Sequence, residues 1–126
     1  MNDLIPTFAE DVVMGQILID HRTITTAARL LKPEQFGSIP HRTVYEACLN
    51  LWRNGSGVDL LTVTTELQRT GSLDAVGGPA GIAGWTLRVA SSRHFEEHAA
   101  IVRDHYAMRV LQDAGAEMMI GAVPGE

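Results

Sequence analysis

Apolar residues recur along most of the chain at steps of three and four, the spacing of one face of an α-helix. No window alternates strictly between apolar and polar positions, as a half-buried strand would. The sequence therefore predicts an all-α fold. The predicted helices run from after Pro6 to about Asp20, from about Ile24 to Leu31, from Pro40 to about Arg53, from Thr62 to Thr70, from Pro79 to about Val89 and from about Arg93 to Ala122.

Proline, threonine and glycine give the boundaries of several predicted helices. Pro40 suits the first turn of the third helix, because its missing N–H would have no partner there. Thr62 is expected to cap the fourth helix with its side-chain oxygen, and Gly71 to end it. Gly84 and Gly115 lie in helix interiors, where glycine costs about 1 kcal/mol relative to alanine. We therefore expect these two glycines to mark close helix contacts.

The last predicted helix carries two apolar stripes and so needs two partners. Its first stripe contains Phe95, Ala99, Val102, Tyr106 and Val110. This line turns polar at Asp113 and Glu117, which predicts that the helix packs on the body up to about Val110 and then projects. The projecting part needs a second helix or another subunit, and the candidate interface residues are Ile101, His105, Met108, Leu111, Met118 and Met119. The alternative is a core helix enclosed on all sides.

Composition limits the size and the partners of the protein. The 126 residues predict one domain, 1–126, with a globular bundle over about 6–92 and the long helix over about 93–122. The chain is 45% hydrophobic and has 10 Lys and Arg against 15 Asp and Glu, a net charge of −5. Because phosphate binding needs clustered basic residues, we expect no direct binding to duplex DNA.

Other whole-chain features point to an ordinary cytoplasmic protein. Polar residues interrupt every apolar run before it reaches the length of a membrane span, and the N-terminus does not resemble a signal peptide. The single cysteine, Cys48, excludes an internal disulfide and is expected to be buried and inert. Trp52 and Trp85 lie on apolar helix faces, which predicts core roles rather than stacking on bases.

One short motif suggests metal chemistry. His94, Glu97 and His98 fit the pattern H-x-x-E-H, in which two histidines one helical turn apart bind zinc and the glutamate acts as a base. A catalytic zinc also needs a third ligand and a cleft, so a solvated acidic helix start is favoured and a small metal-dependent hydrolase is the alternative. Gly77–Gly81 lacks the lysine of a phosphate-binding loop. We expect no catalytic residue, cofactor or metal.

Five short segments occur in an informative order. They are Met14–Asp20 (MGQILID), Phe36 with His41–Ala47 (HRTVYEA), Asn54–Gly55 with Val58–Val63 (VDLLTV), Gly71–Leu73 with Val76–Ala80 (VGGPA), and Ala99–Asp104 (AAIVRD). In this order and spacing they resemble the N-terminal domain of bacterial replicative DNA helicases, the DnaB family. The chain departs from that pattern at Phe8–Asp11, which replaces a more acidic opening, at Gly81, where an aromatic residue is common, and at Val89–Ser91, which replaces a T-P-S turn.

The resemblance implies a non-catalytic helical module: a small bundle followed by a two-helix hairpin, with the long last helix as the first half of that hairpin. It implies self-association, as dimers within the collar of a hexameric ring, and docking of primase and of a helicase loader. The ATPase motor of such helicases is absent from this sequence, so the chain alone would neither hydrolyse ATP nor unwind DNA. A free-standing replication adaptor without any motor is a further alternative.

Overall fold

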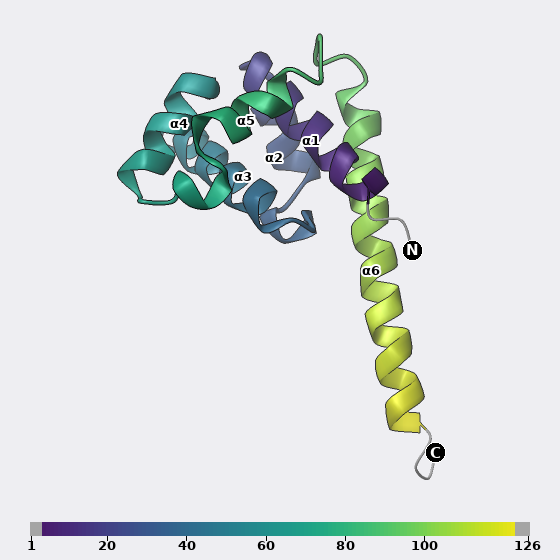
Figure 1. Cartoon of the computed structure of the whole chain (residues 1–126). Helices are drawn as coiled ribbons and strands as arrows, with labels where there is room; N and C mark the ends of the chain where they lie inside the picture. The colour runs from purple at the N-terminus through teal and green to yellow at the C-terminus, as the bar shows by residue number, and fades with distance from the viewer. Residues whose placement is uncertain (1–3, 123–126) are drawn as a thin grey trace.

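The computed structural model describes the backbone of residues 4–122 and the side chains of residues 4–115. In chain order the α-helices are α1 (Leu4–Ile19), α2 (Thr23–Leu30), α3 (Ile39–Arg53), α4 (Leu60–Arg69), α5 (Gly78–Thr86) and α6 (Phe95–Ala122). Two short 3₁₀ turns, η1 (Pro33–Gln35) and η2 (Asp74–Val76), precede α3 and α5. No strand occurs between residues 4 and 122, so the predicted all-α fold with a long C-terminal helix is confirmed (Figure 1).

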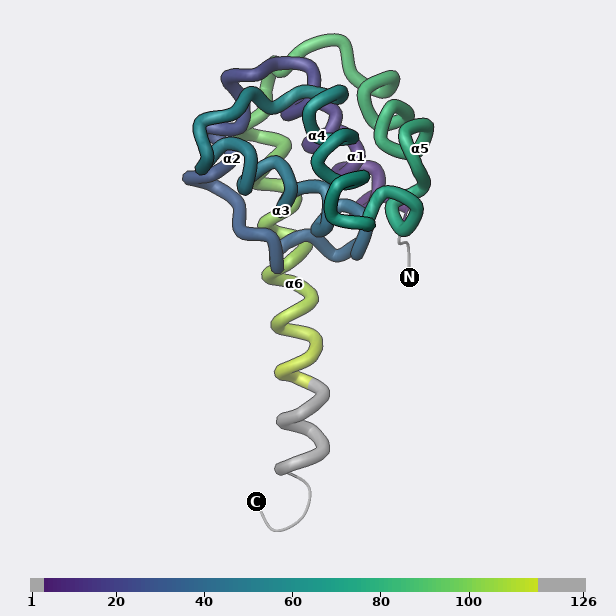
Figure 2. Tube along the Cα trace, turned by 90° about the vertical axis from the view of Figure 1, so that its left-hand side faces the viewer, coloured from purple at the N-terminus to yellow at the C-terminus, as the bar shows by residue number. Residues whose placement is uncertain are grey.

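Helix α1 is the centre of the bundle. It packs against α5 and α6, while α3 contacts α2, α4 and both 3₁₀ turns (Figure 2). Nearly every residue of α1 from Ala9 to Leu18 is buried, because other helices cover it on several sides. The largest fully buried side chains of the core are Met14, Ile17, Ile24, Phe36, Tyr45, Leu67 and Ile82.

The cap of α4 differs from the prediction. Asp59, not Thr62, is the N-cap: its carboxylate accepts the Thr62 backbone N–H at 2.8 Å. The Thr62 hydroxyl in turn accepts the Asp59 backbone N–H at 2.9 Å, so the two residues satisfy each other's donors in a capping box. The prediction of Thr62 as the cap was wrong by one turn, because Asp59 is also a strong capping residue and begins the helix earlier.

Close helix contacts occur at a different glycine from those predicted. A Cβ atom on Gly15 of α1 would lie 2.3 Å from the Trp85 carbonyl oxygen of α5. A Cβ atom on Gly84 or Gly115 would have no neighbour within 4 Å, so the expectation for these two positions was wrong. Gly15 therefore allows α1 and α5 to approach through their backbones.

The seating of α6 matches the two-stripe pattern. Phe95, Ala99 and Val102 are buried against the bundle, with Ala99 and Val102 fully inaccessible. Farther along, Val110 is 45% exposed and Leu111 is 66% exposed. Figures 1 and 2 show α6 continuing well past the body. The alternative of an enclosed core helix is therefore wrong.

The cysteine and the two tryptophans differ in how well the pattern predicted them. Cys48 is fully buried, and burial raises the pKa of its thiol to about 12, as expected for an inert residue. Trp85 is 9% exposed and belongs to the core. Trp52 is 36% exposed, so its expected core role was wrong. It stands in the last turn of α3, next to the exposed Arg53.

Candidate interaction surface

A cluster of polar side chains is buried at the centre of the bundle. The His41 ring, 3% exposed, places Nε2 2.6 Å from Asp11 Oδ1 and Nδ1 3.2 Å from Glu10 Oε1. The ring stacks on Trp85 with 4.5 Å between centroids, and Arg88 Nε lies 3.2 Å from Asp11 Oδ2. These contacts join α1 to the start of α3 and to the end of α5.

Glu10 also holds the loop before α3. Its carboxylate accepts the Gly37 backbone N–H at 2.7 Å and the Ser38 backbone N–H at 3.2 Å. Burial by itself would raise the pKa of Glu10, but the contact with His41 and these two hydrogen bonds outweigh burial and lower it. Glu10 is therefore an ionised carboxylate inside the bundle.

The segment between α5 and α6 is tied to α1 by one glutamine. The Gln16 amide nitrogen donates to the carbonyls of Ser91 and Arg93 at 3.2 and 2.9 Å. Its amide oxygen then faces His98 Nδ1 at 2.9 Å, so this histidine nitrogen carries the hydrogen. Gln16 thus sets where α6 begins relative to α1.

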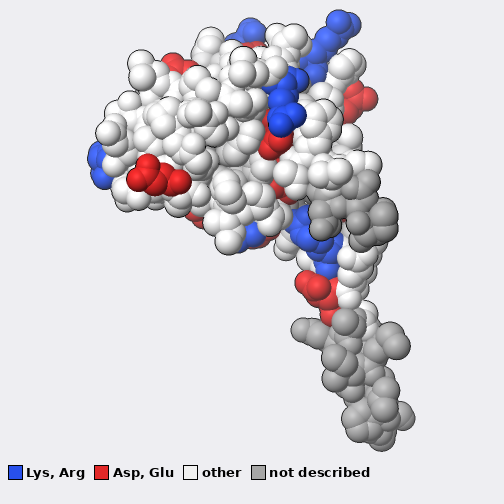
Figure 3. All heavy atoms as spheres, in the orientation of Figure 1, with Lys and Arg blue, Asp and Glu red and all other residues white. Residues whose placement is uncertain are grey.

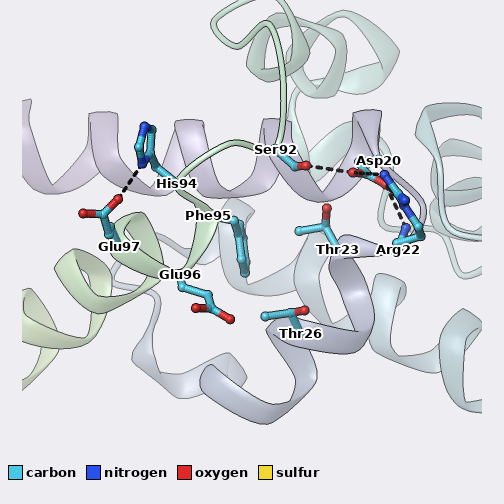
Figure 4. A pocket seen from close by; sticks show the side chains of 9 residues that line it. All are labelled: Asp20, Arg22, Thr23, Thr26, Ser92, His94, Phe95, Glu96 and Glu97. Atoms are coloured by element: carbon cyan, nitrogen blue, oxygen red, sulfur yellow. Dashed lines mark hydrogen bonds and ion pairs between the residues drawn. The ribbon is translucent and has the colours of Figure 1, made fainter.

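A second tie lies in a polar hollow at the same junction (Figure 4). The Ser92 hydroxyl donates to Asp20 Oδ2 at 2.7 Å, and Arg22 donates to Asp20 through its backbone N–H and its guanidinium. The side-chain hydrogen bond from Arg22, then that from Ser92, holds the pKa of Asp20 well below its usual range. The hollow is an anchored turn in which the side chains of Asp20, Arg22 and Ser92 bind one another.

The two histidines of the H-x-x-E-H motif keep their rings 6.3 Å apart at this junction but bind different partners. His94 precedes α6 and has a positive φ of 64°, so it does not share a helical face with His98. Its Nδ1 lies 2.6 Å from Glu97 Oε1 at the surface, whereas His98 turns toward Gln16 of α1. Among the described residues, no three His, Cys, Asp or Glu side chains are grouped so that they could hold a metal ion.

Arg109 makes a contact with the body close to where α6 leaves it. Its guanidinium donates to the Gln35 carbonyl at 3.1 Å and lies over the ring of Tyr106 at 5.8 Å. A Cβ atom on Gly37 would be 3.0 Å from the guanidinium carbon, so Arg109 packs directly on the loop that Glu10 holds from inside.

From Ile101 onward α6 also presents an apolar face that the described residues do not cover. Of the predicted interface residues, Ile101 is 42% exposed, Met108 is 55% exposed and Leu111 is 66% exposed. His105 is half-buried, and its Nδ1 is buried without a hydrogen-bond partner. Met118 and Met119 lie outside the residues whose side chains the structure describes.

The exposed face continues onto α1, which the sequence did not reveal. An apolar groove between α1 and α6 is lined by Ile5, Phe8, Ala9, Val12, His98 and Ile101. Ile5 and Phe8 are more than half exposed. We call this groove together with Met108 and Leu111 the α1–α6 surface. Its α1 part could have been suspected from the apolar residues at the helix start, but its position beside Ile101 depends on the tertiary fold.

Two other surface features are distinct from the α1–α6 surface. A shallow apolar hollow lies between α4 and α5 and is lined by Leu60, Leu61, Thr64, Pro79, Ala80 and Ala83. On the face shown in Figure 3, Lys and Arg side chains are dispersed among uncharged residues. None of the described helices is both long enough and apolar enough to cross a membrane.

Comparison with known proteins gives the family. Residues 5–104 match the family of the DnaB-like helicase N-terminal domain, which is most of the chain. The chain belongs to the DnaB-like helicase N-terminal domain family. The part of these helicases that the match describes is their N-terminal domain.

Relatives of this DnaB-like domain are replicative helicases. The chain is 38% identical over 103 residues to the replicative DNA helicase DnaB of Rhodothermus marinus, covering 82% of this chain and 11% of that protein. It is 34% identical over 114 residues to the replicative DNA helicase DnaC of Bacillus subtilis, covering 88% of this chain and 25% of that protein. The DnaB-like domain therefore spans a quarter or less of either relative.

Solved structures agree with the family. The N-terminal domain of DnaB helicase from Mycobacterium tuberculosis superposes with a TM-score of 0.89 at 29% identity, covering 95% of this chain and 83% of that chain. A DnaB-like replicative helicase, described together with its interactions with primase, superposes with a TM-score of 0.76 at 27% identity, covering 91% of this chain and 27% of that one.

Proposed function

We propose that this DnaB-like domain serves DNA replication by self-association and by docking other replication proteins, as part of the collar of a helicase ring. The observation that carries the proposal is the α1–α6 surface. It joins exposed apolar residues of α6 to the exposed start of α1, and apolar area of this kind is stabilised by burial against another chain. Met118 and Met119 would extend the same interface, and the role would be carried out in the cytoplasm.

The assembly part of the proposal is tested by sedimentation velocity over a wide concentration range. Wild-type chain is expected to shift from monomer to dimer as its concentration rises. Met108→Glu with Leu111→Glu places two charges on the α1–α6 surface, and this double variant is expected to stay monomeric at every concentration. A wild-type protein that stays monomeric throughout would refute self-association through this surface.

A matched double variant controls for added charge. Asn50 of α3 and Gln68 of α4 are exposed and lie away from the α1–α6 surface. Asn50→Glu with Gln68→Glu adds the same two charges to the chain and is expected to dimerise like the wild type. Equal loss of the dimer in both double variants would mean that charge, and not this face, controls association.

The docking part of the proposal concerns primase and a helicase loader. Support comes from the family and from the similar helicase whose structure is described with its interactions with primase. Isothermal titration of the chain with its cognate primase, and separately with its cognate loader, is expected to give saturable binding to each. Heat-denatured chain is the negative control. Binding to neither protein would contradict docking while leaving self-association to stand on its own test.

A further inference from the structure

Helix α6 keeps a polar contact with the body beyond its buried part. Val102 is the last residue of α6 that is buried among residues 4–115. Two helical turns later, the Arg109 guanidinium donates to the Gln35 carbonyl at 3.1 Å. Within the part of the chain whose side chains the structure describes, this is the last side-chain hydrogen bond that joins α6 to the bundle. Arg109 therefore stands between the buried and the projecting parts of the helix.

The loop that receives Arg109 is itself tied to two other helices. From α1, Glu10 accepts the backbone N–H groups of Gly37 and Ser38 at 2.7 and 3.2 Å. From α3, Arg42 donates to the Phe36 carbonyl at 2.9 Å. Because these bonds hold the loop in place, a hydrogen bond from Arg109 to the loop fixes α6 relative to the whole bundle.

Gly37 provides the space that the guanidinium occupies. A Cβ atom at this position would lie 3.0 Å from both Cζ and Nη1 of Arg109. Gly37 is not one of the glycines with positive φ, so its backbone conformation is open to alanine. The missing side chain is therefore needed for the close approach of Arg109 and not for the course of the loop. The guanidinium also lies over the Tyr106 ring, one turn earlier in α6.

We propose that Arg109 is a positioning residue for association: its contact with Gln35 and Gly37, which we call the α6 latch, keeps the turn that carries Met108 and Leu111 ordered before a second copy binds. These two residues are 55% and 66% exposed, so packing on the bundle does little to hold them. A helix end without tertiary contacts is marginally stable in water. The latch keeps this turn helical and fixes its direction.

Order in the free chain strengthens binding because it lowers the entropy that association costs. A segment that is already in its bound conformation loses less freedom when the interface forms. Loss of the latch is therefore expected to weaken the dimer even though Arg109 need not touch the second copy. This role rests on the proposed self-association, whereas the latch itself can be tested in the monomer.

A double-mutant cycle tests the latch in the monomer. Gly37→Ala and Arg109→Ala are each expected to raise the unfolding equilibrium constant in urea by about three- to tenfold, the effect of one lost hydrogen bond. With Arg109→Ala already present, Gly37→Ala is expected to cause no further loss, because the group that its methyl displaces is absent. Additive losses, or a Gly37→Ala variant as stable as the wild type, would overturn the latch.

Sedimentation equilibrium of the folded chain tests the role in association. Arg109→Ala is expected to raise the dimer dissociation constant by about threefold or more. Arg103→Ala removes the same charge from the same helix and is expected to keep the wild-type constant. An unchanged constant in Arg109→Ala, or an equal rise in Arg103→Ala, would overturn the positioning role while wild-type dimers still support self-association. A wild-type chain that stays monomeric would refute both.

Discussion

The two halves of α6 share one helix but have opposite surroundings. In the first half, Phe95, Ala99 and Val102 are buried against the bundle, whereas Val110 and Leu111 in the second half are 45% and 66% exposed. The first half therefore contributes to folding, and in our proposal the second contributes to association. The difference teaches that apolar stripes on a helix show how many partners it needs, but not whether those partners belong to the same chain.

The largest expected effect comes from placing the same substitution in both halves. Val102 is fully buried and Val110 is 45% exposed. Val102→Asp buries a carboxylate with no partner and is expected to lower the free energy of unfolding by about 4 kcal/mol, measured by urea denaturation at a concentration where the chain is monomeric. Val110→Asp is expected to change it by no more than about 0.5 kcal/mol. Similar losses in both variants would break the comparison.

Alanine substitutions at two glycines test backbone packing inside the bundle and in the projecting part of α6. Gly15→Ala forces a methyl group against the Trp85 carbonyl and is expected to cost about 1–3 kcal/mol in thermal or urea unfolding. Gly115→Ala in the projecting half meets no atom within 4 Å and is expected to increase the helical signal in far-UV circular dichroism without destabilising the bundle. A destabilised Gly115→Ala variant would show that the projecting half has contacts within its own chain.

Arg109 tests where the seated half ends. Arg109→Gln removes the charged hydrogen bond to the Gln35 carbonyl and is expected to cost about 1 kcal/mol. Hydrogen exchange should show faster amide exchange in α6 from about residue 106 onward, with residues 95–102 unchanged. Arg103→Gln, on the same helix, is the control. Faster exchange along the whole of α6 would mean that the part packed on the bundle ends nearer the start of the helix.

The smallest expected effect concerns the anchored turn before α6. Because the pKa of Asp20 is lowered in the folded chain, the folded state binds fewer protons than the unfolded state below about pH 4. The stability that Asp20 contributes is thus fully present above the ordinary aspartate pKa of about 3.9 and is lost as the pH falls below it. Asp20→Asn is expected to reduce the loss of stability between about pH 5 and pH 3. Ser92→Ala, which removes one donor to Asp20, should have a smaller effect of the same sign; an unchanged acid profile in both would exclude this role.

Local signals in the sequence predicted the helices and the double-faced α6. Pro40 stands in the first turn of α3 and Gly71 follows α4. The point where α6 leaves the body follows from helical periodicity, since the stripe of Phe95, Ala99 and Val102 turns polar at Asp113 and cannot remain on the core. These features depend on residues within one or two turns of each other.

Features that depend on distant residues were not predictable in this way. Asp11 and His41 are 30 positions apart, and each by itself resembles an ordinary polar residue. Gly15 resembles a weak point in a helix until α5 is placed against it. Likewise, Phe8 joins the α1–α6 surface only because the fold brings the start of α1 beside Ile101.

The burial of Cys48 has a practical consequence for spectroscopy. Its thiol is enclosed and its pKa is raised to about 12, so reagents that attack the thiolate should leave it unmodified in the folded chain. Since this is the single native cysteine, a cysteine introduced at Met108 would carry the one reactive thiol of the protein. A spin label or fluorophore attached there could report distances between copies without prior removal of the native residue.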